Sequence, residues 1–172
     1  MTREEALEFL RRHQPLPPDG ELSEETITAY DAARRFFLAN PDSESIALFL
    51  YSFGDGSGFG VYQLVEDVIA KHHPNDVVPI LSLALQTGGK GVKYWGAQIA
   101  ERFPDSRLLG PLAVTLSDPD SDIRSASTLA IACIGGRDAR ALLQSRLEIE
   151  DDSEVREAIE ELLTWPQLRD GQ

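Results

Sequence analysis

The sequence has 172 residues, of which 42% are hydrophobic, and 16 basic against 29 acidic side chains give it a net charge of −13. This length predicts one domain with a sizeable core, and no apolar run is long enough to cross a bilayer. The acidic charge argues against a nucleic-acid or anionic-membrane partner and favours a basic one. The single cysteine, Cys133, and the charged residues at 1–13, where a signal peptide would be apolar, indicate a cytoplasmic protein.

Short helices separated by Pro, Gly, Asn and Asp account for the whole chain, and no segment shows the two-residue alternation of a strand. A first helix is expected over 3–13, followed by a proline-rich connector. Ser23 is then placed as the N-cap of a helix that ends near Ala39. Further helices are expected from Asp42 or Ser43 to the glycine-rich loop 54–60 and at 61–72, 76–86, 92–103, 107–117, 122–135, 138–148 and 153–164.

An apolar pattern recurs along the chain every 31 or 32 residues. Val61, Val92, Ile123 and Val155 are spaced in this way, and each is followed by apolar residues three, seven and eight positions later. Such a stripe is typical of a helix packed along one face, and stepping back from Val61 to Tyr30 adds a fifth unit. The spacing predicts an all-α solenoid of about five helical hairpins.

The predicted solenoid forms a single domain over 1–172. Residues 1–22 serve as an N-terminal capping helix and connector, residues 23–164 contain the repeats, and residues 165–172 form a tail. Trp165 in this tail is expected to cover the open end of the last hairpin.

Two segments, SDPDSDIRSASTLAIACIG and IEDDSEVREAIEELL, share an acidic turn followed by Ile123-Arg124 or Val155-Arg156. They resemble HEAT-like repeats of the short bacterial, bilin-lyase type, with the clearest likeness over 118–163. The resemblance implies that an acidic residue six positions before each arginine joins a ladder of polar contacts between units. Asp118 and Glu150 have this spacing.

Motifs that suggest a ligand are incomplete in this chain. The loop 54–60 (GDGSGFG) lacks the Gly-Lys-Ser/Thr ending of a P-loop and is expected to be a turn whose glycines leave it mobile. Asp118, Asp120 and Asp122 lack the glycine and glutamate that complete a calcium loop, so they are expected to form a turn and helix N-terminus. His72-His73 has no third ligand at useful spacing. No metal or cofactor is expected.

Two large side chains of the chain remain to be placed. Trp95 occupies a repeat position that favours the core over a ligand platform, and Phe59 in the glycine-rich loop is either a contact residue or folded back. No Ser/His/Asp or Cys/His constellation can be assembled from three histidines, which favours a non-enzymatic protein.

An excess of acid between residues 148 and 161 is the remaining functional candidate. Arg156 is the one basic residue in this segment. Because like charges at this density repel one another, a basic partner would reduce the electrostatic repulsion. The alternative is a solvated face. The predicted partner-binding residues are Glu148, Glu150, Asp151, Asp152, Glu154, Glu157, Glu160 and Glu161.

A protein-binding role is therefore the leading functional hypothesis. The resemblance and the charge together favour an immunity protein that neutralises a basic toxin domain, with the acidic surface steering association. A general scaffold or adaptor is the alternative, and a relative of the bilin lyases is a third hypothesis. A HEAT-like DNA glycosylase is disfavoured by the net charge of −13.

Overall fold

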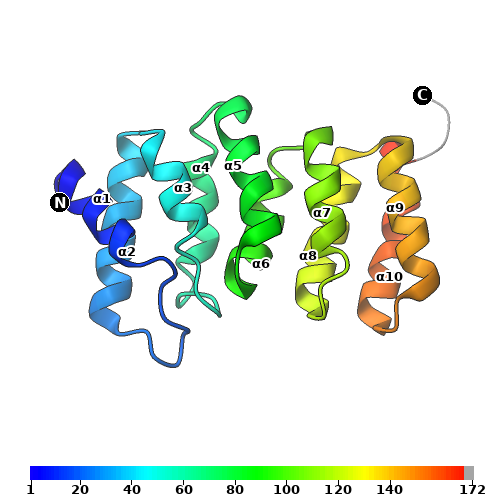
Figure 1. Cartoon of the computed structure of the whole chain (residues 1–172), viewed down its shortest axis with the longest axis horizontal. Helices are drawn as coiled ribbons and strands as arrows, with labels where there is room; N and C mark the ends of the chain where they lie inside the picture. Colours follow the sequence, from blue (N-terminus) through cyan, green and yellow to red (C-terminus); the bar gives the residue numbers. More distant parts are fainter. Residues whose placement is uncertain (169–172) are drawn as a thin grey trace. The chain divides into compact units, whose positions relative to one another are not determined.

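The computed structural model describes residues 1–168, and this part of the chain contains ten α-helices, three 3-10 turns and no strand. The predicted all-α fold is thus confirmed. The α-helices are α1 (Arg3–Arg12), α2 (Glu24–Ala39), α3 (Glu44–Leu50), α4 (Glu66–Ile69), α5 (Pro74–Thr87), α6 (Lys90–Ala100), α7 (Leu109–Thr115), α8 (Ser121–Ile134), α9 (Gly136–Ile149) and α10 (Ser153–Leu162) (Figure 1). The 3-10 turns are η1 (Tyr62–Val65), η2 (Ser106–Leu108) and η3 (Pro166–Leu168).

The chain divides into two compact units, with the boundary between Trp95 and Gly96, inside α6. Whether the chain behaves as one domain over 1–172 stays a prediction. In the first unit, α1 packs against α2 and α3, α2 packs against α4, and α3 packs against α5. In the second unit, α8 lies against α10, α7 packs against α8 and α9, and α9 packs against both α8 and α10 (Figure 1). Stacked helical hairpins of this kind form an α-solenoid.

Aromatic side chains form the centre of the first unit. Tyr62 lies edge-on to both Tyr30 and Trp95, with ring centroids 5.7 and 6.0 Å away. Trp95 is 8% exposed, as expected of a core residue. Burial raises the pKa of Tyr62 to about 12, so this phenol stays neutral in the core at physiological pH.

Side-chain caps begin α2, α8 and α10 at positions that the sequence favours, whereas Ser43 at the start of α3 makes no such bond. Ser23 accepts a hydrogen bond from the backbone N–H of Thr26, at 3.1 Å, which confirms the predicted cap of α2. Asp120 and Asp152 cap α8 and α10 in the same way, each accepting from two backbone N–H groups of the first turn. The acidic turns are thus local signals that start helices.

The buried face of the repeats differs at one position from the predicted stripe. The residue three positions after each repeat start is not uniformly core, because Leu64 is 40% exposed. The residue four positions after the start is buried in all five units. These residues are Arg34, Val65, Gly96, Ser127 and Ile159. An apolar pattern misses this row because only two of the five side chains are apolar.

The last helix is followed by a 3-10 turn in place of the second helix of a fifth hairpin. Leu168 in η3 is 1% exposed and covers the end of this unit, whereas Trp165, expected in that role, is half-buried. Arg140 fixes the turn by donating from Nη1 to the carbonyls of Leu163 and Leu168, at 3.3 and 2.9 Å. The rest of the predicted tail, residues 169–172, lies outside the described residues.

Candidate functional site

Arg124 and Arg156, the arginines of the two clearest repeats, close the turns that precede their helices. Nη1 of Arg124 donates to the backbone carbonyls of Asp118 and Pro119, both at 3.0 Å. Nη1 of Arg156 donates in the same way to the carbonyl of Glu150, at 3.0 Å. The six-residue spacing therefore reflects a contact between the arginine and a backbone carbonyl of the turn.

The Glu150 carboxylate instead reaches back to the arginine of the preceding repeat. It accepts from Nε and Nη2 of Arg124, at 3.0 and 2.7 Å, in a bidentate pair. It also accepts from Nε of Arg146, at 2.7 Å, and from the backbone N–H groups of Asp151 and Asp152. Glu150 thus joins a polar contact between two repeats, as the resemblance implies, and its arginine partner there is Arg124 of the preceding unit.

The side chain of Glu150 is fully buried. Its burial and its arginine partners shift the pKa of the carboxyl in opposite directions. Burial alone would raise the pKa of this carboxyl, but hydrogen bonds from Arg124 and Arg146 outweigh it, so the pKa lies well below its ordinary value. The same bonds raise the pKa of Arg124. Both groups are therefore ionised over the physiological pH range, and the cluster is a permanent internal ion network.

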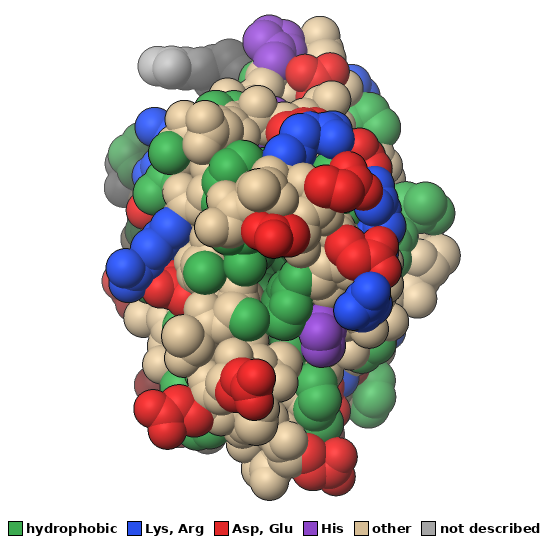
Figure 2. All heavy atoms as spheres, turned by 90° about the vertical axis from the view of Figure 1, so that its left-hand side faces the viewer, with side chains coloured by type: hydrophobic (Ala, Val, Ile, Leu, Met, Phe, Trp, Pro, Cys, Tyr) green, Lys and Arg blue, Asp and Glu red, His purple; other side chains and the backbone are tan. Residues whose placement is uncertain are grey.

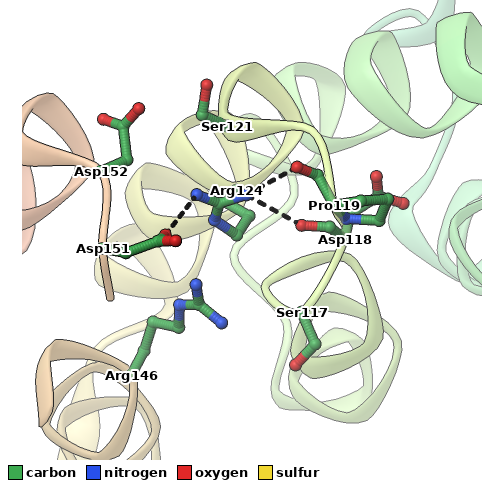
Figure 3. A pocket seen from close by; sticks show the side chains of 8 residues that line it. All are labelled: Ser117, Asp118, Pro119, Ser121, Arg124, Arg146, Asp151 and Asp152. Carbon is green, nitrogen blue, oxygen red and sulfur yellow. Dashed lines mark hydrogen bonds and ion pairs between the residues drawn. The ribbon is translucent and has the colours of Figure 1, made fainter. Parts of the chain in front are cut away.

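A pocket of about 540 Å³ opens above this network in the second unit. Figure 3 shows Arg124 between the carbonyls of Asp118 and Pro119 on one side and Asp151 and Arg146 on the other. Asp151 is 92% exposed at the side chain, with its carboxylate 3.6 Å from Arg124. Arg124 and Arg146 are both already bonded to Glu150. The charged groups that the pocket presents to a partner are therefore mainly the aspartates at its rim. Arg146 was not predicted here; its position four residues before Glu150 on a helix is the signal that could have found it.

The predicted partner-binding residues fall into two groups in the structure. Glu150 is buried in the ion network and Asp152 is half-buried as the cap of α10, so both carboxylates have internal structural contacts. The other residues of the set are exposed on α9, on α10 and on the turn between them. They are Glu148, Asp151, Glu154, Glu157, Glu160 and Glu161.

The outer face of α10 carries a row of exposed glutamates. Val155, Ile159 and Leu162 are the buried residues of this helix, and the glutamates lie away from them. Glu154, Glu157 and Glu161 are three and four residues apart and therefore neighbours on one face, with Glu160 beside them. Within residues 1–168 none of the four has an ion-pair partner. We call these four residues the α10 acidic face.

Acidic side chains at the other end of the chain are paired. Arg3 of α1 bonds to Asp42 and Glu44, at 2.6 and 3.0 Å, and Arg11 also bonds to Glu44. These contacts lower the pKa of both carboxyls, with the hydrogen bonds from the arginines as the largest cause. Figure 2, which views the molecule from the α1 side, shows acidic and basic side chains interspersed on this face. The α10 acidic face lacks such compensation.

No cluster of three or more His, Cys, Asp or Glu side chains that could hold a metal ion occurs in the described part of the chain. Asp118 and Asp120 instead accept hydrogen bonds from nearby backbone N–H groups, as expected of a turn. Nδ1 of His73 caps α5 by accepting from the N–H of Asn75. His72 ends the preceding turn half-buried, and burial lowers its pKa.

A comparison of the sequence with models of protein families finds a match in the C-terminal part of the chain. The family model of HEAT repeats matches residues 70–164, more than half of the chain. The chain belongs to the HEAT-repeat family. No curated protein matches the sequence.

The HEAT-repeat match covers the part of this protein with the clearest sequence pattern, and the resemblance over 118–163 is confirmed. HEAT repeats are protein-interaction modules whose stacked units present extended binding surfaces. Residues 1–69 lie outside the match, which agrees with the weaker repeat pattern there. None of the described helices is both long and apolar enough to cross a membrane.

Proposed function

We propose that this HEAT-repeat protein is a cytoplasmic, non-enzymatic module that binds a basic protein through the α10 acidic face. The observation that supports the proposal is the contrast in ion pairing. Acidic residues beside α1 have arginine partners, whereas Glu154, Glu157, Glu160 and Glu161 have none within residues 1–168. Like charges three or four residues apart cost a helix about 0.2–0.5 kcal/mol per pair, which a cationic partner would offset.

The specific form of this proposal is an immunity protein that covers a Lys/Arg-rich toxin domain. Exposed Asp151 and Glu148 extend the α10 acidic face toward α9 and the rim of the pocket. A broad acidic surface accelerates association with a basic partner and makes the rate depend on ionic strength. The partner is expected to be encoded beside this protein's gene and to arrest growth when it is expressed alone.

The test compares two sets of substitutions that change the net charge equally. In the first, Glu154, Glu157, Glu160 and Glu161 are all replaced by Gln. In the matched control, Glu21, Glu24, Glu25 and Asp76, which are also exposed, are replaced by Gln or Asn. At about 0.2–1 kcal/mol for each exposed pair, the first set should weaken binding to the neighbouring-gene product roughly fourfold or more.

The control set should change the affinity much less, because it alters the overall charge without altering the proposed surface. Growth rescue in cells that express the toxin domain provides a second measurement. Equal losses of affinity in the two sets would show that only the overall charge matters. An unchanged affinity in both sets would leave the α10 acidic face as a solvated surface and contradict the proposal.

A further inference from the structure

Phe59 of the first unit combines two unusual features: its aromatic side chain is exposed to solvent, and its backbone has a left-handed conformation. Its side chain is 62% exposed. Its φ angle is +51°, and among the described residues it is the one non-glycine residue with a positive φ. Bulky residues rarely adopt this left-handed conformation, which glycine adopts without cost. The turn alone would therefore be better served by glycine than by Phe59.

A carboxylate from the connector after α1 fixes the backbone around Phe59. Asp19 accepts hydrogen bonds from the N–H groups of Ser57 and Gly58, at 2.9 and 2.8 Å, and from the Ser57 hydroxyl, at 3.1 Å. The N–H of Asp19 in turn donates to the carbonyl of Asp55, at 3.0 Å. The expected mobility of the loop 54–60 is therefore opposed by contacts on the residues that precede Phe59.

Two core aromatic residues hold the same loop from its other side. Nε1 of Trp95 donates to the carbonyl of Gly56, at 3.0 Å, and the hydroxyl of Tyr62 accepts from the N–H of Gly54, at 3.3 Å. A Cβ atom on Gly58 would lie 2.5 Å from the ring of Tyr62, so the loop rests directly on the core here. The loop is anchored on both sides, yet the Phe59 side chain lies exposed outside the core.

We propose that Phe59 is a pre-organised anchor that inserts into an apolar pocket of a partner protein. Rigid aromatic side chains that are ordered before binding lose little entropy on association and are typical binding hot spots. Asp55 lies in the loop itself, the exposed Asp67 follows it in the sequence, and residues 1–76 carry 6 basic against 14 acidic side chains. A pocket rimmed by Lys or Arg is therefore the complementary surface.

This surface belongs to the first unit and does not depend on the α10 acidic face of the second. Either proposal can fail while the other holds, since Phe59 substitutions leave the glutamates of α10 unchanged. Leu83 on α5 provides a matched control, because it is an apolar residue of the same unit that is 54% exposed.

A photo-crosslinking amino acid placed at position 59 or at position 83 of the full chain, in cells of the source organism, tests the anchor. The adduct specific to position 59 is identified by mass spectrometry, and the protein found is purified and titrated against wild type, Phe59→Ala, Phe59→Leu and Leu83→Ala. The affinity should fall by about 30-fold or more in Phe59→Ala, partly recover in Phe59→Leu and stay unchanged in Leu83→Ala. Salt should weaken binding if the pocket rim is basic.

A second measurement separates an anchor from a structural residue. Glycine adopts a positive φ without steric cost. The melting temperature of Phe59→Gly should therefore stay within about 3 °C of that of wild type. A larger drop would show that the side chain supports the fold and would overturn the proposal. The same conclusion follows if no adduct is specific to position 59, or if the crosslinked protein binds Phe59→Ala as tightly as wild type.

Discussion

Glu150 shows how much a single carboxylate can do in this fold. It accepts five hydrogen bonds, from two guanidinium groups and two backbone N–H groups, and its side chain is fully buried. Removing one member of a buried ion network leaves the others without compensation, which costs far more than an exposed pair contributes. The residue therefore supports the fold between two repeats, although its charge alone made it a candidate for partner binding.

Replacing Glu150 by Gln should lower the free energy of unfolding by about 3 kcal/mol, because Arg124 and Arg146 would share no carboxylate. Chemical denaturation at pH 7 measures this loss. Asp151→Asn is the control, since the exposed Asp151 side chain should contribute no more than about 1 kcal/mol. A loss in Glu150→Gln as small as in the control would contradict the role of Glu150 in the network.

The pH dependence of the same variant provides an independent check. The pKa of Glu150 is lowered in the folded state, so its contribution to stability is complete above the unfolded-state pKa of roughly 4.3 and disappears as the pH falls toward the folded value. The stability gap between wild type and Glu150→Gln should therefore be constant from neutral pH down to about pH 5 and narrow below roughly pH 4. A gap that widens in acid would contradict the lowered pKa.

The residue scale is also where the sequence is least informative. The acid six positions before Arg124 was visible, but whether its carbonyl or its carboxylate makes the contact depends on the three-dimensional turn. The buried row that contains Arg34 and Ser127 was missed because its side chains are polar and an apolar pattern does not register them. Ser127 is satisfied in the core by donating to the hydroxyl of Thr115, at 2.7 Å, a partner twelve residues away.

At the scale of elements, local side-chain caps mark the starts of several helices, whereas the end of the second unit depends on tertiary contacts. Ser23, Asp120 and Asp152 cap helices as their chemistry predicts, because a cap bonds to backbone within its own first turn. Which side chain covers the end of α9 depends on long-range packing, and from the sequence Trp165 was expected at this place. Leu168 is the buried residue there.

Leu168→Ala should therefore destabilise the second unit by about 2–4 kcal/mol, the usual cost of truncating a buried leucine. Thermal unfolding followed by circular dichroism measures the change. Pro166→Ala, at an exposed position of the same η3 turn, should change the stability little. If the two variants unfold alike, η3 does not cover the end of the helices as the contacts with α9 and α8 indicate.

At the scale of the whole molecule, acidic side chains outnumber basic ones by 29 to 16. The net charge is −13, and the α10 acidic face adds local repulsion that no basic side chain within residues 1–168 offsets. Self-repulsion of this kind destabilises a compact state. The fold class and the sign of the charge were both predictable from the sequence, because the first depends on the spacing of apolar residues and the second on a count of charged residues. The ion pairs of individual acidic residues were not predictable, because they form between residues that folding brings together.

Raising the salt concentration from about 10 mM to 150 mM should increase the melting temperature, since screening at these ionic strengths shortens the Debye length to about 8 Å and weakens repulsion among exposed charges. The gain should shrink when Glu154, Glu157, Glu160 and Glu161 are all replaced by Gln. Scanning calorimetry at pH 7 measures both effects. A melting temperature that falls with salt would show that the arginine pairs around α1 dominate the electrostatic energy.

Because Arg124 pairs with a carboxylate from the next repeat, the two partners of this ion pair are synthesised at different times. Glu150 follows Arg124 by 26 residues, so this arginine leaves the ribosome long before its counter-charge exists. At elongation rates of roughly 5–20 residues per second, the interval lasts on the order of one to five seconds. The hairpin that contains Arg124 therefore gains this ion pair only after the turn that precedes α10 has been synthesised.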